Sequence, residues 1–87
     1  MNTQPEHTPR RPTWNCRICE TEWPCLAARS LLRVEYHADP VALRVHLGLL
    51  LHQATEDLYK LHPNPGPDPA RLHARFLAWA DPFQGDP

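Results

Sequence analysis

The sequence predicts a small all-α domain of three helices with a zinc knuckle at its N-terminal end. Apolar residues recur at spacings of three and four in three segments, which is the period of one helix face. Two Asp-Pro pairs, at positions 39–40 and 68–69, mark the starts of the second and third segments. We therefore divide the chain into a flexible Pro/Arg-rich arm (1–13), a single zinc-stabilised helical domain (14–80) and a flexible tail (81–87).

The arm and the first helix are separated by a segment that contains the three cysteines. Prolines at positions 5, 9 and 12 predict an irregular arm. Because proline is favoured at the first helical position, we expect the first helix to run from Pro24 to about His37. Arg29 and Arg33 are expected to point toward solvent. The apolar face comprises Cys25, Ala28, Leu32 and Tyr36, widened by Leu31 and Val34.

The second helix is predicted from Pro40 to about Leu61, with Asp39 as its cap. Its apolar stripe comprises Leu43, Leu47, Leu50, Ala54, Leu58 and Leu61. Val45, Leu49 and Leu51 add more apolar surface than one face needs, which predicts burial on two sides. A proline-rich break at 62–67 precedes the third helix, from Asp68-Pro69 to near Ala80. Leu72, Phe76 and Trp79 mark its buried face.

Length and charge exclude several classes of protein. The chain has 87 residues, with 9 Lys+Arg against 10 Asp+Glu and a formal net charge of -1. One small core at most fits in this length, which excludes a multidomain enzyme. A nucleic-acid-binding domain is normally clearly basic, so the charge gives such a partner little support. No apolar run reaches the roughly 18 residues of a membrane helix, and we expect no signal peptide.

Cysteine usage favours a reducing compartment. The chain has 3 cysteines, an odd number. Closely spaced thiols in a reducing cytoplasm are more often ligands or redox groups than structural disulfides. We therefore expect a cytoplasmic protein.

Metal binding is the chemistry that the sequence supports best. Cys16, Cys19 and Cys25 are spaced Cys-x2-Cys-x5-Cys, which lets three thiolates converge on one metal ion. Soft thiolate ligands favour zinc, with an iron–sulfur cluster as the alternative. Cys25 falls at the expected start of the first helix, where the helix dipole favours a negatively charged ligand. The other interpretation is that Cys16 and Cys19 are a redox pair and Cys25 is a small core residue.

A tetrahedral structural zinc ion needs a fourth ligand, for which 6 histidines compete. His7 is the first choice, because the proline-rich arm can fold back over the cysteine segment. His73 and His46 are alternatives, as are water and a side chain from a partner. Lone histidines on a helix or at its end are usually solvated, so no role is assigned to His37, His52 and His62.

Two tryptophans flank the cysteines, in the same segment as the basic residues. Trp14 and Trp23 are expected to pack the metal-binding loop onto the helices rather than to stack on bases. The alternative is a nucleic-acid-binding surface formed by Arg10, Arg11, Arg17 and Trp14.

No catalytic arrangement stands out, and we do not expect an enzyme. The chain has only 3 glycines, none of them in a phosphate-binding loop. A zinc hydrolase that used Glu20 or Glu22 would need an open coordination position on the metal.

One motif extends over the arm and the cysteines. From His7 to Cys16 the chain reads His-Thr-Pro-Arg-Arg-Pro-Thr-Trp-Asn-Cys, followed by Cys19 and by Trp-Pro-Cys at 23–25. With its closing Arg-Phe-Leu at 75–77, the chain resembles a group of short actinobacterial proteins with the motif HxPxRPxWxCxxC...WPC. The resemblance implies a zinc-binding fold, with His7 inside the matched motif. Glu20 departs from the pattern, because such proteins tend to have glycine after the second cysteine.

The cysteine spacing is also similar to that of WhiB-like iron–sulfur regulators, over ten residues only. Those proteins use a fourth cysteine upstream, and none precedes Cys16. Their Gly-Trp-rich turn is missing as well. A cluster here would need histidine as its fourth ligand.

Taken together, these patterns predict a small zinc-binding protein that acts as a protein-interaction or regulatory adaptor module. The surplus apolar residues of the helix at 40–61 predict that it binds a protein partner or pairs with its own copy in a homodimer. The alternative is a transcriptional regulator, either nucleic-acid-binding or WhiB-like with an iron–sulfur cluster.

Overall fold

The computed structural model describes residues 6–80 and is mostly helical. The predicted tail and the first five residues of the predicted arm lie outside this range. The elements, in order, are strands β1 (Pro9–Arg10) and β2 (Asn15–Cys16), helices α1 (Leu26–Glu35), α2 (Pro40–Leu61) and α3 (Pro69–Phe76), and the short 3-10 helix η1 (Ala78–Ala80).

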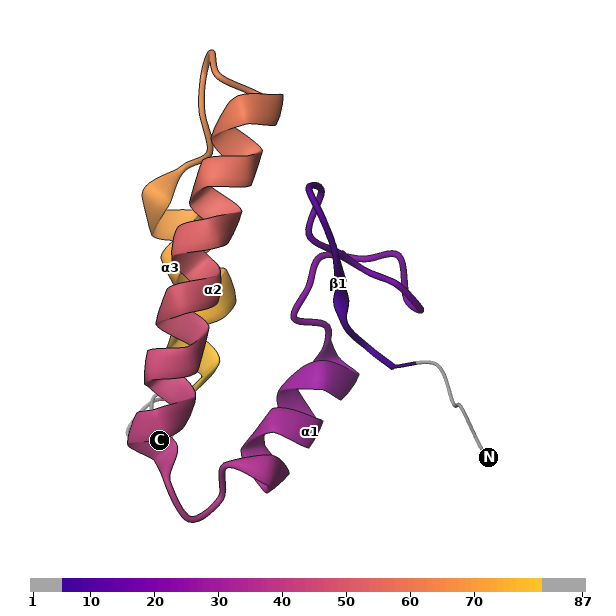
Figure 1. Ribbon diagram of the computed structural model, residues 1–87, viewed down its shortest axis with the longest axis vertical. Coiled ribbons are helices and arrows are strands. Elements are labelled where there is room, and N and C mark those ends of the chain that lie inside the picture. Colours follow the sequence, from indigo (N-terminus) through magenta and orange to yellow (C-terminus); the bar gives the residue numbers. More distant parts are fainter. Residues whose placement is uncertain (1–5, 81–87) are drawn as a thin grey trace.

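Helices α2 and α3 run side by side, and the N-terminal hairpin lies next to α2 with α1 below it (Figure 1). The segment between α1 and α2 is short, so the end of α1 lies near the start of α2. There the rings of Tyr36 and His46 stack with their centroids 5.9 Å apart. Within residues 6–80, no helix is long and apolar enough to cross a membrane.

Both Asp-Pro starts are confirmed. Asp39 accepts a hydrogen bond from the Ala42 amide at 3.0 Å, and Asp68 accepts one from the Ala70 amide at the same distance. Each aspartate satisfies an amide that lacks a partner in the first turn, and the following proline needs none. Helix α2 has the predicted bounds. Helix α3 ends earlier than predicted, and its last turn continues separately as η1.

The first helix differs from the prediction at both ends. It begins at Leu26, with Cys25 as its N-cap, and ends at Glu35. Pro24 precedes the helix and is fully buried in the loop. The predicted widening of the apolar face is wrong, because Leu31 and Val34 are 60% and 75% exposed. Among the residues of α1, Ala28 is buried, so the helix packs against the described part of the chain on that side.

Of the two arginines of α1 that were predicted to point toward solvent, Arg33 is exposed and Arg29 is half-buried, and both contact Trp79. The Arg29 and Arg33 guanidinium groups lie over the Trp79 ring, 5.7 and 5.3 Å from its centroid. Arg33 also donates to the Trp79 carbonyl at 2.9 Å. The two side chains cover the indole and gain cation–π attraction, so they fasten η1 to α1.

The second half of the predicted arm is an ordered part of the domain. Strand β1 pairs with β2 in antiparallel register, with Pro9 opposite Cys16 and Arg10 opposite Asn15. The Trp14 amide donates to the Arg10 carbonyl at 2.7 Å, and Trp14 adopts a left-handed φ of 63°. Strands of two residues leave no alternating pattern, which is why the sequence did not reveal this hairpin.

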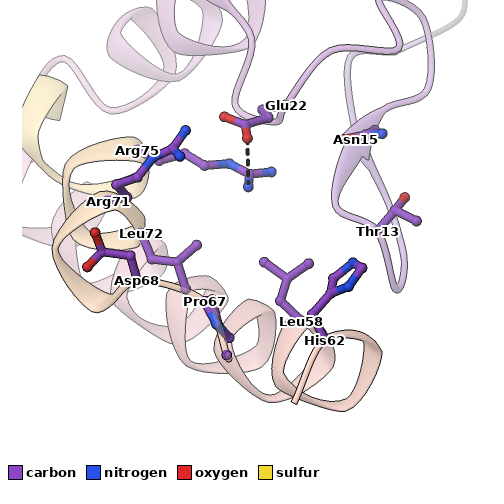
Figure 2. A pocket seen from close by; sticks show the side chains of 11 residues that line it. Thr13, Asn15, Glu22, Leu58, His62, Pro67, Asp68, Arg71, Leu72 and Arg75 are labelled. Carbon is purple, nitrogen blue, oxygen red and sulfur yellow. Dashed lines mark ion pairs between the residues drawn. The ribbon is translucent and has the colours of Figure 1, made fainter. Parts of the chain in front are cut away.

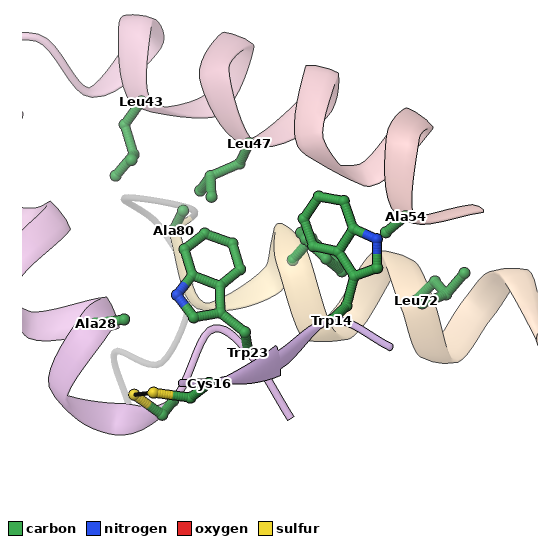
Figure 3. Close-up of a cluster of buried hydrophobic side chains, with 11 residues drawn as sticks. Trp14, Cys16, Trp23, Ala28, Leu43, Leu47, Ala54, Leu72 and Ala80 are labelled. Atoms are coloured by element: carbon green, nitrogen blue, oxygen red, sulfur yellow. Dashed lines mark hydrogen bonds between the residues drawn. The ribbon is translucent and has the colours of Figure 1, made fainter. Parts of the chain in front are cut away.

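The core lies between the hairpin, α2 and α3 (Figure 3). Trp14, Trp23 and Phe76 form an aromatic cluster with ring centroids 5.8 to 6.4 Å apart. Helix α2 contributes three buried members of the predicted stripe, Leu43, Leu47 and Ala54. Trp14 and Trp23 therefore pack the hairpin onto the helices, as expected.

Burial of α2 on two sides is not observed. Val45 is 59% exposed and Leu49 is 62% exposed. Leu61, the last residue of the predicted stripe, is also exposed at the end of the helix. One apolar face of α2 is thus used by the core, and a second lies at the surface.

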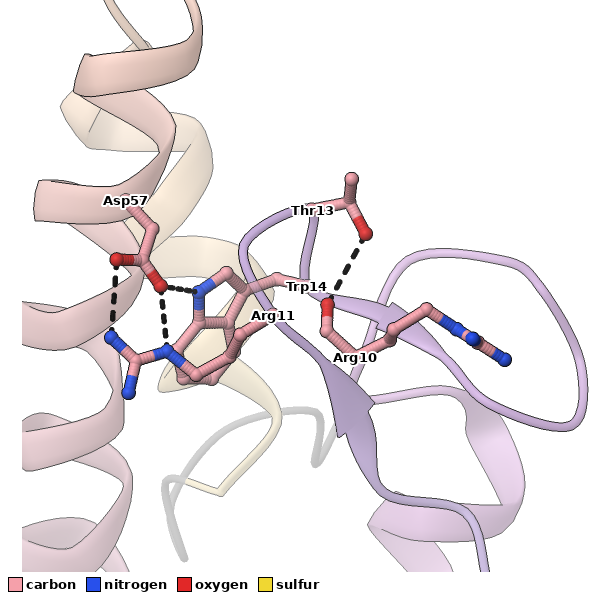
Figure 4. A network of polar contacts seen from close by, with 5 residues as sticks. All are labelled: Arg10, Arg11, Thr13, Trp14 and Asp57. Atoms are coloured by element: carbon pink, nitrogen blue, oxygen red, sulfur yellow. Dashed lines mark hydrogen bonds and ion pairs between the residues drawn. The ribbon is translucent and has the colours of Figure 1, made fainter.

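A polar contact joins the hairpin to α2 (Figure 4). The Asp57 carboxylate accepts from the Trp14 indole Nε1 at 2.8 Å and pairs with Arg11 through bonds of 2.7 and 3.1 Å. The bond from Arg11 and that from Trp14 lower the pKa of Asp57 against the opposing effect of burial. Asp57 therefore satisfies the only polar atom of the buried Trp14 side chain.

We expect Asp57→Ala to lower the free energy of unfolding by about 2 kcal/mol, because the Trp14 N–H loses its acceptor inside the fold. The measurement is denaturant unfolding. Glu56→Ala is the matched control, because exposed Glu56 pairs with His52 at 3.5 Å on the surface of the same helix, and it should change stability by less than about 0.5 kcal/mol. Equal losses in the two variants would show that the contact does not hold the hairpin.

Candidate metal centre

Four segments bring the candidate ligands together. Cys16 ends β2, Cys19 lies in the turn that follows, and Cys25 is the N-cap of α1. His7 lies two residues before β1, the strand that pairs with β2. The pairing continues toward His7, because the Arg17 amide donates to the Thr8 carbonyl at 3.0 Å. The hairpin therefore folds the arm back over the cysteines, which places His7 where the sequence predicted.

The four ligand atoms form a compact group. His7 Nδ1 lies 3.4 Å from the Cys16 sulfur, 3.5 Å from that of Cys19 and 3.3 Å from that of Cys25. The sulfurs of Cys16 and Cys25 are 3.7 Å apart, and all four atoms lie within 4.8 Å of one another. Within the described range this is the only group of three or more such residues that could hold a metal ion.

These distances fit one tetrahedral ion. Zn–S bonds of about 2.3 Å and Zn–N bonds of about 2.0–2.1 Å imply tetrahedron edges of about 3.8 Å between sulfurs and about 3.5 Å between sulfur and nitrogen. The observed nitrogen–sulfur distances of 3.3 to 3.5 Å and the sulfur–sulfur distance of 3.7 Å are close to both values. His7, Cys16, Cys19 and Cys25 are therefore a possible metal site.

Backbone amides stabilise the Cys16 thiolate. The amides of Ile18 and Cys19 both donate to the Cys16 sulfur at 3.4 Å. Burial alone would raise the pKa of Cys16, but these amides, together with His7 and Cys25, lower it to about 6. The Cys16 thiol is thus prepared to act as an anionic ligand.

The turn after Cys19 requires an unusual backbone conformation. Glu20 has a left-handed φ of 62°, and its amide donates to the Cys16 carbonyl at 3.0 Å. This is the position at which the sequence lacked the glycine of the proteins it resembles. Glutamate adopts the conformation here at an energetic cost that glycine would not incur.

The three cysteines differ in accessibility. Cys16 is 1% exposed and Cys25 is 7% exposed, whereas Cys19 is at the surface. Local desolvation and the neighbouring sulfurs of Cys25 and Cys16 raise the pKa of Cys19 to about 11. Three thiolates in such close contact repel one another, and a cation between them removes that repulsion.

His7 is held by the aromatic core. The Trp23 indole Nε1 donates to the His7 carbonyl at 2.9 Å, and the Trp23 ring is buried against Trp14 and Phe76. This bond fixes the backbone of the arm at the ligand position. Trp23 thus links the packing of the core to the placement of the fourth ligand.

Arg75 is a positioning residue that the sequence analysis missed. Its Nε donates to the Trp23 carbonyl at 2.7 Å and one terminal nitrogen donates to the Trp14 carbonyl at 2.6 Å. Burial lowers the pKa of Arg75, while Glu22, 3.9 Å away, opposes that shift. The guanidinium group of Arg75, on α3, therefore holds the backbone carbonyls of both tryptophans that flank the cysteines. An arginine in a short helix carries no sequence signal for this role.

Apart from the group of four ligands, a cleft lies between the hairpin, the end of α2 and α3 (Figure 2). This cleft of about 360 Å³ has a mixed lining of leucines and charged groups. Glu22, considered above as an acid or base for a zinc hydrolase, lines the cleft and faces Arg75. The lining includes Thr13, Asn15, Leu58, His62, Asp68 and Arg71.

The candidate nucleic-acid-binding residues are not gathered on one free surface. Trp14 is buried in the core, so its ring has no face available for a base, and Arg11 is paired with Asp57. Arg10 and Arg17 are exposed. His46 contacts Tyr36, and His73 lies on α3 beside Leu72, so neither belongs to the cluster of ligands.

Protein-family models, curated proteins and solved structures show no match to the chain. The resemblances to the short actinobacterial proteins and to the WhiB-like regulators therefore stay predictions. The geometry of His7, Cys16, Cys19 and Cys25 is what indicates a possible metal centre.

Replacing Glu20 by glycine should stabilise the protein by about 0.5–1 kcal/mol, because the left-handed backbone becomes free of the Cβ clash. Denaturant unfolding measures the change. Thr21→Gly is the control at the next residue, which does not have a positive φ, and it should lower stability. A loss of stability in Glu20→Gly as well would contradict the assigned conformation.

Proposed function

We propose that the chain is a small zinc-binding protein in which His7, Cys16, Cys19 and Cys25 form a zinc knuckle that holds one structural zinc ion. The observation that carries the proposal is the match between four distances, three from His7 Nδ1 to sulfur and one between the sulfurs of Cys16 and Cys25, and the edges of a zinc tetrahedron. Four protein ligands leave no position open for a substrate, which is typical of structural rather than catalytic zinc.

The geometry supports a single ion over an iron–sulfur cluster. In a [4Fe–4S] cluster each ligand binds a different iron, so the ligand atoms are spread around the whole cluster. Here all four ligand atoms lie within 4.8 Å of one another. The pair of amides on the Cys16 sulfur also offsets the excess negative charge that three thiolates bring to one divalent ion.

The proposed zinc ion would supply stability that the hairpin lacks. Its two strands are only two residues each. A hairpin this short has no hydrophobic core of its own. Structural zinc contributes on the order of 10 kcal/mol to the folding of small domains. A reducing compartment such as the cytoplasm would keep the three thiols available as ligands.

The interaction surface of this module is the outer face of α2. Val41, Val45 and Leu49 are 69%, 59% and 62% exposed and follow one another at four-residue spacing, on the side opposite Leu43 and Leu47. We propose a second copy of the chain as the partner. The three residues are spaced symmetrically about Val45, so two antiparallel α2 helices would place Val41 against Leu49 of the other copy, as a two-fold interface requires.

His7→Ala and Cys25→Ser should each reduce bound zinc well below one ion per chain, because three ligands no longer close the site. Metal analysis and an absorption spectrum of anaerobically purified protein make the measurement. His52→Ala is the control, because exposed His52 on α2 does not belong to the group of four ligands, and it should retain full zinc content. A brown wild-type protein that contains iron and sulfide would contradict the zinc assignment.

Val45→Glu should shift the protein from dimer to monomer in sedimentation velocity, because the charge would lie at the symmetry axis of the interface. Gln53→Glu adds the same charge at another exposed position of α2 and should leave the dimer intact. Zinc content should be unchanged in both variants. A wild-type protein that stays monomeric across a hundredfold range of concentration would overturn the choice of partner.

A further inference from the structure

We infer that Cys19 is an oxidation site, at which hydroperoxides attack the metal centre and cause it to release its metal. The inference deepens the proposed function and rests on it, because the reactive group is a zinc-bound thiolate. It adds that the centre responds to oxidants through one particular sulfur.

Accessibility separates Cys19 from the other two ligands. Cys16 and Cys25 are buried, at 1% and 7% exposure, and lie beneath the hairpin and the start of α1. Cys19 is exposed in the turn between them. Metal-bound cysteines are thiolates, and among thiolates the exposed one meets a dissolved peroxide first.

Hydrogen bonding points the same way. Two amides donate to the Cys16 sulfur at 3.4 Å and lower the electron density available for attack on an oxidant. No amide hydrogen bond to the Cys19 sulfur is present in the part of the chain that the structure describes, where its neighbours are His7 Nδ1 at 3.5 Å and the sulfurs of Cys16 and Cys25. Cys19 is thus both the accessible sulfur and the less stabilised one.

In the first step the Cys19 sulfur attacks one oxygen of hydrogen peroxide, the simplest hydroperoxide. An S–O bond forms, the O–O bond breaks and hydroxide leaves, so the cysteine becomes a sulfenic acid while the peroxide is reduced. A sulfenic acid is a poorer ligand than a thiolate. The site is then held by three good ligands.

In the second step the Cys16 sulfur attacks the Cys19 sulfur. An S–S bond forms, the S–O bond breaks and a second hydroxide leaves, so two thiolates and one hydrogen peroxide give a disulfide and two hydroxides, which the buffer protonates to water. Cys16 is the expected partner because it belongs to the same four-residue turn, whereas Cys25 is fixed at the N-terminus of α1. Only His7 and Cys25 remain as ligands.

The test treats zinc-loaded wild-type protein with hydrogen peroxide and follows zinc release with a colorimetric chelator. Cys19→His and Cys25→His each keep four ligands, and their zinc content is measured before treatment. Cys19→His should release zinc more slowly than wild type by roughly an order of magnitude, because the exposed thiolate is gone. Cys25→His should release zinc about as fast as wild type.

Peptide mapping gives a second readout. Trypsin cleaves after Arg17 and a glutamate-specific protease cleaves after Glu20, so the three cysteines fall on three separate peptides. We expect a Cys16–Cys19 disulfide and a Cys25 that still reacts with an alkylating agent. A disulfide that omits Cys19, or equal rates of release in the two variants, would overturn the inference.

Untreated zinc content separates this inference from the proposed function. A wild-type protein that holds one zinc ion per chain but keeps it under peroxide would contradict the oxidation site alone. A wild-type protein that binds no zinc would contradict both.

Discussion

The structure depends on the convergence of three cysteine sulfurs and one histidine nitrogen on a single point. These atoms come from the segment before β1, from β2, from the turn after it and from the start of α1, which the β1–β2 pairing and short backbone hydrogen bonds bring together. Three sulfurs this close to one another would repel as thiolates, so the arrangement needs a positive charge at its centre. In the proposed structure a zinc ion supplies that charge, and the N-terminal third of the chain folds around it.

The helices hold this centre through a small number of directional contacts. Arg75 clamps the carbonyls of Trp14 and Trp23, Trp23 in turn fixes the His7 carbonyl, and Asp57 satisfies the Trp14 indole. Aromatic packing against Phe76 completes the connection. The ligands and the hydrophobic core are therefore coupled, because the same two tryptophans serve both. Loss of metal would loosen the packing of the hairpin, and loss of these contacts would misplace His7.

Local signals predicted the helices and the ligands well, because each had a strong physical cause in adjacent residues. The Asp-Pro starts and the apolar stripe of α2 follow from capping and helix period, and the cysteine spacing with an upstream histidine predicted the four side chains that converge on the possible metal site. Long-range contacts could not be predicted. The roles of Arg75 and Asp57 depend on residues more than 40 positions away. The stacking of Arg29 and Arg33 on Trp79 depends on how η1 packs against α1. The exposure of Val45 and Leu49 likewise depends on how many elements pack against α2.

One ion held by three sulfurs and one nitrogen has a distinctive X-ray absorption spectrum at the zinc edge. For protein purified with its metal we expect a first shell of three sulfurs at about 2.3 Å and one nitrogen at about 2.0 Å, with no second metal nearby. A first shell that contains oxygen in place of a sulfur or of the histidine nitrogen would contradict the closed site, and a metal–metal distance would contradict the single ion.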